Sequence, residues 1–162
     1  MSASDIHLKL SGIKGESTSV QHKDEVEVQN WAWAVTGASP APGGGGGGAG
    51  RATFSGLHFT HRVDRASPDL WKACATGRHI RDAVLSVARP GAGTQDYLVI
   101  KLSDVSVSSV SMSDGAGDTL VPHESVGLVF AKVEYAYKPQ NPNGSLGAAV
   151  EFKFDLAANR VF

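Results

Sequence analysis

Residues 96–112 read DYLVIKLSDVSVSSVSM, and apolar side chains occupy alternate positions along most of this stretch. A period of two residues is typical of a β-strand with one buried face. The apolar set moves to the opposite parity after Leu102 and again after Val107. Because strands usually span about 5–6 residues, the stretch either coils around a barrel or breaks at Ser103 and Asp104.

The same alternation recurs along the rest of the chain. We expect further strands within residues 5–10, 25–35, 52–63, 80–89, 125–138 and 150–156. Phase changes predict a bulge or a strong twist near Gln29 and Asn30, and a bulge at Gly56. The sequence therefore predicts a mostly β protein, a small β-barrel of two packed sheets.

One helix is predicted at Ser67–Thr76. Ser67 is a favourable N-cap, Pro68 suits the first helical position, and Gly77 is a favourable stop. A helix of about ten residues is marginal alone, so it has to pack against the sheet.

The composition excludes several classes of protein. The chain has 162 residues, a formal net charge of −1 and one cysteine, and we expect a single domain over residues 1–162. No basic excess neutralises phosphates, so we expect no nucleic-acid partner. One cysteine excludes an intrachain disulfide and a cysteine-cluster metal site. The sequence shows no signal peptide and no apolar run of spanning length, so we expect a cytoplasmic protein that inserts in no membrane.

The histidines form no catalytic or metal-binding motif. His58 and His61 differ by an odd number of residues, so on a strand they point to opposite faces. The glycine run at residues 43–48 lacks the Lys-Ser/Thr pair of a phosphate loop. We therefore expect no enzyme activity, no catalytic residue, no cofactor and no metal.

Two pairs of residues leave other functions open. Trp31 and Trp33 share one strand face and either stack on sugars, in a small-ligand or carbohydrate-binding β-barrel, or pack inside the barrel. Cys74 and His79 would suit a small enzyme, although a lone helical cysteine is usually a small buried hydrophobe.

The stretch of residues 125–138 carries apolar side chains on both faces. A strand of a monomeric barrel would keep one face polar, so we expect a helix or another subunit to cover the second face. The residues expected at a subunit interface are Val129, Val133, Tyr135, Tyr137, Phe152 and Phe154.

The order of several segments is more informative than any one of them. They are Ile-Lys-Gly-Glu-Ser at 13–17, Trp-Ala-Trp at 31–33, Leu-His-Phe-Thr at 57–60, Ser-Pro-Asp-Leu at 67–70, Ala-Cys-Ala-Thr-Gly-Arg-His at 73–79, Tyr-Leu-Val-Ile at 97–100, Val-Ser-Val-Ser-Ser-Val-Ser at 105–111 and Tyr-x-Tyr-x-Pro-Gln at 135–140. In this order, over essentially the whole chain, the sequence resembles the haemolysin-coregulated protein (Hcp) family of type VI secretion systems.

The resemblance implies a β-barrel with a flanking helix, related to phage tail-tube proteins. Members of the family form hexameric rings that stack into a tube inside a contractile sheath, with a spike at its tip. The tube is ejected into a target cell, and some members hold small effectors in the ring lumen. We therefore expect a homo-hexamer with these partners, secreted without a cleavable signal peptide, and with no C-terminal toxin extension.

A long glycine-rich loop is predicted between two of the strands, with far more residues than the about 2–5 of a hairpin connection. The resemblance suggests that this loop reaches the neighbouring ring of a stack. The residues of the predicted ring-stacking loop are Ala38, Pro40, Pro42, Gly43, Gly44, Gly45, Gly46, Gly47, Gly48 and Gly50.

Overall fold

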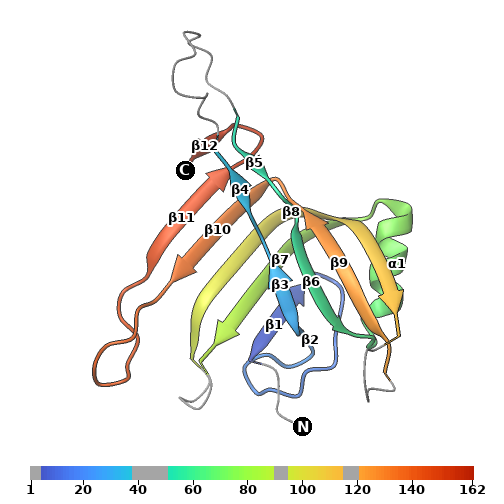
Figure 1. Cartoon of the computed structure of the whole chain (residues 1–162), viewed down its shortest axis with the longest axis horizontal. Helices are drawn as coiled ribbons and strands as arrows, with labels where there is room; N and C mark the ends of the chain where they lie inside the picture. The colour runs from blue at the N-terminus through green and yellow to red at the C-terminus, as the bar shows by residue number, and fades with distance from the viewer. Residues whose placement is uncertain (1–4, 38–50, 90–94, 115–120) are drawn as a thin grey trace.

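The computed structural model describes residues 5–37, 51–89, 95–114 and 121–162 (Figure 1). These residues form one helix, α1 (Ser67–Thr76), and twelve strands. The strands are β1 (Ile6–Leu10), β2 (Val26–Glu27), β3 (Asn30–Ala32), β4 (Val35–Thr36), β5 (Thr53–Phe54), β6 (Leu57–Arg62), β7 (His79–Ala88), β8 (Asp96–Ser113), β9 (His123–Val129), β10 (Lys132–Tyr137), β11 (Val150–Asp155) and β12 (Arg160–Val161). The mostly β fold with one helix is confirmed. The predicted loop of residues 38–50 lies outside the described residues.

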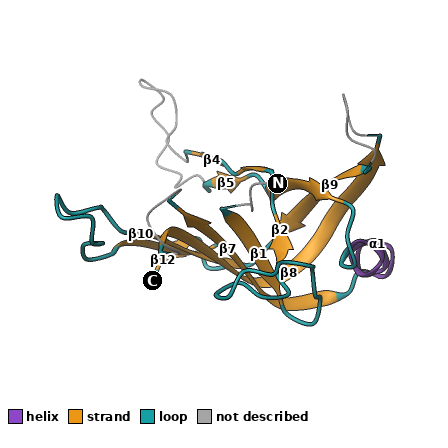
Figure 2. Ribbon diagram, turned by 90° about the horizontal axis from the view of Figure 1, so that it is seen from below, coloured by secondary structure: helices purple, strands orange, loops and turns teal. Residues whose placement is uncertain are grey.

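Ten strands pair in one sheet, in the order β12-β11-β10-β8-β7-β1-β2, and β9, β6 and β3 continue from the second half of β8. The strands β4 and β5 form a separate two-stranded sheet. Figure 2 shows that the large sheet curls, while α1 lies outside it.

Near Gln29 and Asn30, where a bulge or a strong twist was predicted, the chain changes its hydrogen-bond partners. The Val28 N–H donates to Ile6 O in β1 at 2.9 Å, and the Gln29 N–H donates to Thr60 O in β6 at 2.8 Å. This crossing links two edges of the curled sheet that are distant in the strand order.

The strand β8 is continuous over 18 residues and does not break at Ser103 and Asp104. Its first half pairs with β10 and its second half with β9, while β7 pairs along the other edge. Asp104 has a φ of 55° where the partners change, and the register with β9 shifts around Ser108. These two irregularities account for both phase shifts in the sequence, because each turns the following side chains to the other face.

Residues 125–138, predicted as one strand, instead span β9 and β10. The break includes Ala131, whose N–H donates to Ser103 O at 3.0 Å, where β8 turns. The break reverses the parity of the inward side chains, so Leu128 and Val133 are both buried in the core. The inference that this segment carries two opposed apolar faces is therefore wrong.

Gly56 separates β5 from β6 and does not form a bulge within one strand. A Cβ at this position would lie 2.7 Å from Leu128 O. The glycine thus allows a close approach to β9 where the chain passes from the small sheet to the large one.

The helix has the predicted bounds, but Ser67 is not its N-cap. Asp64 holds the first turn: its Oδ1 accepts the Ala66 N–H at 2.8 Å, and its own N–H donates to Ser67 Oγ at 3.1 Å. This reciprocal arrangement resembles a capping box that begins three residues upstream. Gly77 ends the helix with a φ of 67°, as predicted, and Leu70 is fully buried.

Candidate functional site

The strands β10, β11 and β12 extend beyond β8 and are called the wing here (Figure 1). Cross-strand pairs on its inner face join Val133 with Phe154, Tyr135 with Phe152 and Tyr137 with Val150. Exposure rises along this face: Val133 is fully buried, Tyr137 is 36% exposed and Val150 is 66% exposed. Apolar surface is therefore uncovered at the end of the wing that carries Tyr137 and Val150.

An aromatic cluster occupies the other end of this inner face. The Phe54 ring lies 5.2 Å from the Phe154 ring and 6.0 Å from the Trp33 ring, measured between centroids. Trp33 also contacts Tyr135 at 6.2 Å. Both Trp31 and Trp33 pack against the core. This placement supports the packing interpretation of the two indoles over a flat sugar-binding platform.

The six residues predicted at a subunit interface do not share one surface. Val133 lies in the core, which removes it from any interface, because the break before β10 turns it inward. Val129 is 45% exposed at the end of β9, outside the wing. Tyr137 is exposed on the wing. The other three are partly buried on the wing: Tyr135, Phe152 and Phe154.

A shallow groove of about 230 Å³ lies over β3, β6, β9 and the second half of β8. Its lining includes the small polar side chains of Thr60, Ser109 and Ser125, together with His58 and Trp31. The hydroxyl groups give this groove hydrogen-bonding capacity without formal charge.

The structure places His58 and His61 on opposite faces of β6, as predicted, with His58 exposed and His61 fully buried. No three His, Cys, Asp or Glu side chains of the described ranges are grouped so that they could hold a metal ion. Cys74 packs against the core, and the exposed His79 places its Nε2 3.0 Å from Asp104 Oδ1. The two residues proposed for an enzyme thus have separate partners.

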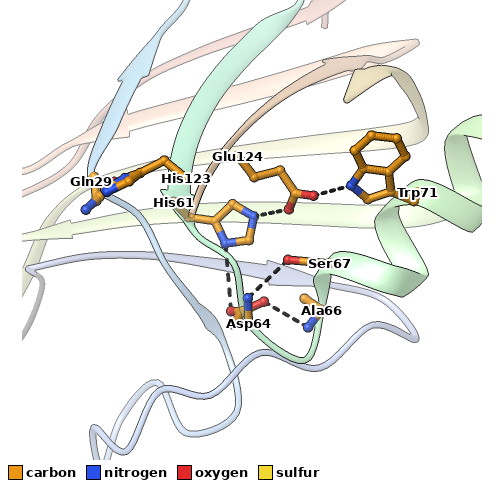
Figure 3. Close-up of polar contacts among 8 residues, drawn as sticks. All are labelled: Gln29, His61, Asp64, Ala66, Ser67, Trp71, His123 and Glu124. Atoms are coloured by element: carbon orange, nitrogen blue, oxygen red, sulfur yellow. Dashed lines mark hydrogen bonds and ion pairs between the residues drawn. The ribbon is translucent and has the colours of Figure 1, made fainter. Parts of the chain in front are cut away.

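His61 and Asp64 belong to a buried polar cluster, and the sequence did not reveal its other members, Glu124 and Trp71 (Figure 3). The His61 Nε2 lies 2.6 Å from Glu124 Oε2, and its Nδ1 lies 3.8 Å from Asp64 Oδ2. Trp71 Nε1 on α1 donates to Glu124 Oε1. Burial raises the pKa of Asp64 above its ordinary value. The cluster ties the helix to the β6–β9 ladder, in which His61 and Glu124 are directly opposite.

A second ionic group joins the loop after β1 to the start of β8. His22 Nδ1 lies 2.9 Å from Glu25 Oε2, and His22 Nε2 lies 2.9 Å from Asp96 Oδ2. The ring stacks on His7, with centroids 4.7 Å apart. Although burial opposes it, hydrogen bonding to Glu25 and Asp96 raises the pKa of His22. Burial and the neighbouring His22 lower the pKa of His7.

The order of elements and the positions of these sites can now be compared with known proteins. Residues 7–137 match the family model described as "Type VI secretion system effector, Hcp". The chain belongs to the Hcp family. It is 42% identical over 159 residues to the protein hcp1 of Pseudomonas aeruginosa, a match that covers 97% of this chain and 98% of the other.

Two solved structures share this fold over nearly the whole chain. The crystal structure of Hcp1 from Salmonella typhimurium is 34% identical, with a TM-score of 0.81 and coverage of 99% of this chain and 100% of that chain. A structure described as a type six secretion system protein is 28% identical, with a TM-score of 0.90 and the same coverage. The family resemblance stated from the sequence is therefore confirmed.

The Hcp family match does not explain the His61 cluster, which sequence reasoning missed. One signal was available, since His61 shares its parity with Leu57 and Phe59 on the buried face of β6. A buried histidine requires a polar partner, but Glu124, which lies against its Nε2, is 63 positions away in the sequence. Among the helices of the described residues, none is long and apolar enough to cross a membrane.

Proposed function

We propose that this Hcp-family protein is the structural subunit of a secretion tube. Six copies form a ring, and rings stack inside a contractile sheath with a spike at the tip. The tube is ejected into a target cell and takes small effectors in its lumen. The observation that carries the proposal is the uncovered apolar end of the wing, in a chain that aligns with Hcp1 over nearly its whole length.

The inner face of the wing is the surface best suited to a neighbouring copy. Tyr137, Val150 and Val161 are exposed, and Val161 continues this face because it is paired with Phe154. Exposed apolar patches are typical of protein interfaces. The outer face is instead charged and paired within itself, with Lys153 Nζ 3.6 Å from a Glu134 oxygen. A closed ring needs a head-to-tail contact, so this face would bind a different surface of the next copy.

The predicted glycine-rich loop of residues 38–50 lies between β4 and β5 in the sequence, and in this proposal it contacts the next ring of the stack. Ordering such a loop costs about 1–2 kcal/mol of backbone entropy per residue. Each ring–ring contact would then be weak for its area, which suits a tube that assembles and later disassembles. In this proposal the protein is made in the cytoplasm and leaves the cell through the secretion apparatus.

Two exposed valines provide a matched test of the ring. Val150 is 66% exposed on the wing, and Val20 is 96% exposed on the loop after β1. Val150→Glu is expected to reduce the mass measured by light scattering from a hexamer towards a monomer, because it buries a charge in the contact. Val20→Glu adds the same charge elsewhere and should leave the ring intact, and both variants should keep the circular dichroism of the unmutated protein.

Two outcomes would overturn the proposed assembly. The first is a monomeric unmutated protein at micromolar concentration. The second is a Val150→Glu ring as stable as the Val20→Glu ring.

The predicted loop is tested separately. Replacing residues 43–48 with a two-residue turn should leave rings intact, change their stacking and abolish secretion. Unaltered stacking and secretion would make it a passive linker.

A further inference from the structure

The loop between β10 and β11, residues 138–149, projects from the wing (Figure 1). Its own backbone hydrogen bonds hold it: the Asn141 N–H donates to Ser145 O and the Gly147 N–H donates to Pro139 O, both at 2.7 Å. The Gly144 N–H donates to Asn141 O at 2.9 Å, and Gly144 has a φ of 90°. The side chains at the tip therefore have defined positions although they are exposed.

The Asn143 side chain is held in a particular way at this tip. Its Oδ1 accepts two hydrogen bonds from Ser145, one from the backbone N–H at 3.1 Å and one from Oγ–H at 2.6 Å. Asn141 Nδ2 donates to the same Ser145 Oγ at 3.1 Å, which directs the hydroxyl proton towards Asn143. The bond from the backbone N–H closes an Asx turn. That hydrogen-bonded ring contains both the Asn143 Cγ and the Gly144 nitrogen.

We propose that Asn143 is a site of spontaneous deamidation through attack of the Gly144 backbone nitrogen on the Asn143 carboxamide. Three observations favour this reaction. The residue after Asn143 is glycine, so no Cβ shields the nucleophile. The tip is exposed to water. The two donors from Ser145 are placed at the oxygen on which negative charge develops when the carboxamide is attacked.

The reaction needs only water as a co-reactant. A bond forms between Gly144 N and Asn143 Cγ, the bond from Cγ to Nδ2 breaks, and the nitrogen leaves as ammonia with the proton from the Gly144 N–H. Water then opens the cyclic imide. Opening at Cγ gives aspartate, and opening at the Asn143 backbone carbonyl gives isoaspartate. Nothing is oxidised or reduced.

One hydrogen bond of the Gly144 nitrogen opposes the reaction and lowers its rate. The Gly144 N–H donates to Asn141 O, and this hydrogen bond has to be given up before the nitrogen can attack. The conversion is therefore a slow ageing reaction of the folded protein. Its product carries a new carboxylate at the tip of the loop, and the isoaspartate form also inserts an extra backbone carbon into a tight turn.

The loop offers an internal control. Asn141 is also exposed, but Pro142 follows it and has no N–H to form the imide. The purified full-length protein would be kept at physiological temperature and neutral pH for several weeks and sampled by peptide mapping with mass spectrometry. A gain of about one dalton is expected at Asn143 and not at Asn141. Labelling with an isoaspartyl methyltransferase should detect part of the product.

Two variants test the role of the turn. Asn143→Gln should abolish the conversion. Ser145→Ala removes one of the two donors and should slow the conversion at Asn143 by about threefold, a small effect because the site is in water, while Ser145→Thr should restore the rate. An unchanged Asn143 after this time would overturn the proposal. Equal or faster conversion in Ser145→Ala would also overturn it, since the turn would then protect the residue.

Discussion

Replacing the buried Glu124 with alanine is expected to lower the free energy of unfolding by about 3–5 kcal/mol. Its Oε2 lies 2.6 Å from His61 Nε2, and its Oε1 accepts the hydrogen bond of Trp71 Nε1. Without the carboxylate, the His61 ring would stay in a fully buried site without this partner, and the polar bond between α1 and β9 would be lost. Most of the cost comes from the polar group left unpaired inside the protein.

Urea unfolding followed by far-UV circular dichroism measures this loss. With an m-value of roughly 2 kcal/mol per M, the midpoint should fall by about 1.5–2.5 M. Protomer concentrations must be equal, because assembly adds stability by mass action. Glu124→Gln keeps the shape and an acceptor for Trp71, so it should cost less, about 1–3 kcal/mol. His79→Ala breaks only an exposed pair and should stay within about 1 kcal/mol. An unchanged midpoint in Glu124→Ala, with an unchanged m-value, would refute the reasoning.

Three further predictions follow from groups elsewhere in the fold. The pKa of His22 is higher in the folded protein than its value of about 6.5 in the unfolded chain, so the stability that His22 contributes is full below pH 6.5 and is lost as the pH rises through the folded pKa. His22→Gln should therefore lower the free energy of unfolding more at acidic than at alkaline pH, measured in the same unfolding assay. Burial raises the pKa of Asp64, so ionisation of this carboxylate lowers the stability of the folded protein as the pH rises. Asp64→Asn keeps an acceptor for the Ala66 N–H, so at neutral pH its melting temperature should equal or exceed that of the unmutated protein. Asp64→Ala removes the acceptor and should lower the free energy of unfolding by about 1 kcal/mol. A Cβ at Gly15 would lie 2.5 Å from the Glu25 backbone oxygen, so Gly15→Ala should cost about 1–3 kcal/mol, while Gly37→Ala, which meets open space, should leave the melting temperature unchanged.

Local patterns predicted most of the strands because a half-buried strand leaves its period in the sequence. The phase change near Gln29 lies where the chain changes its hydrogen-bond partner, although it was interpreted as a bulge or a strong twist. The break between β9 and β10 was missed because Ala131 is neither glycine nor proline and carries no turn signal. Its cause lies in β8, where Asp104 adopts a positive φ and the ladder passes from β10 to β9. A sequence window cannot contain both strands, so this break depends on tertiary structure.

The sites were harder to predict than the strands, because their members come from distant segments. His61 and Glu124 are 63 positions apart, and only the register of β6 against β9 makes them opposite. The N-cap illustrates a smaller error: Ser67 was chosen from its preference, but the N-cap is Ala66, and the Ser67 hydroxyl accepts the Asp64 N–H instead. Capping preferences rank residue types, but they do not decide which of several neighbouring residues is the N-cap.

The break at Ala131 also bears on the proposed contact between copies of the chain. Because it reverses the parity, Val133 joins the core near the barrel, while the same face continues outward through Tyr137 and Val150. The aromatic cluster around Trp33 covers only the inner part of that face. A stable protein contact buries roughly 800 Å² on each partner, more than two side chains can supply. The contact should therefore extend over the wing to its edge at β12. That edge is only two residues long, too short for a long strand-to-strand addition, so side-chain packing should provide most of the binding between copies.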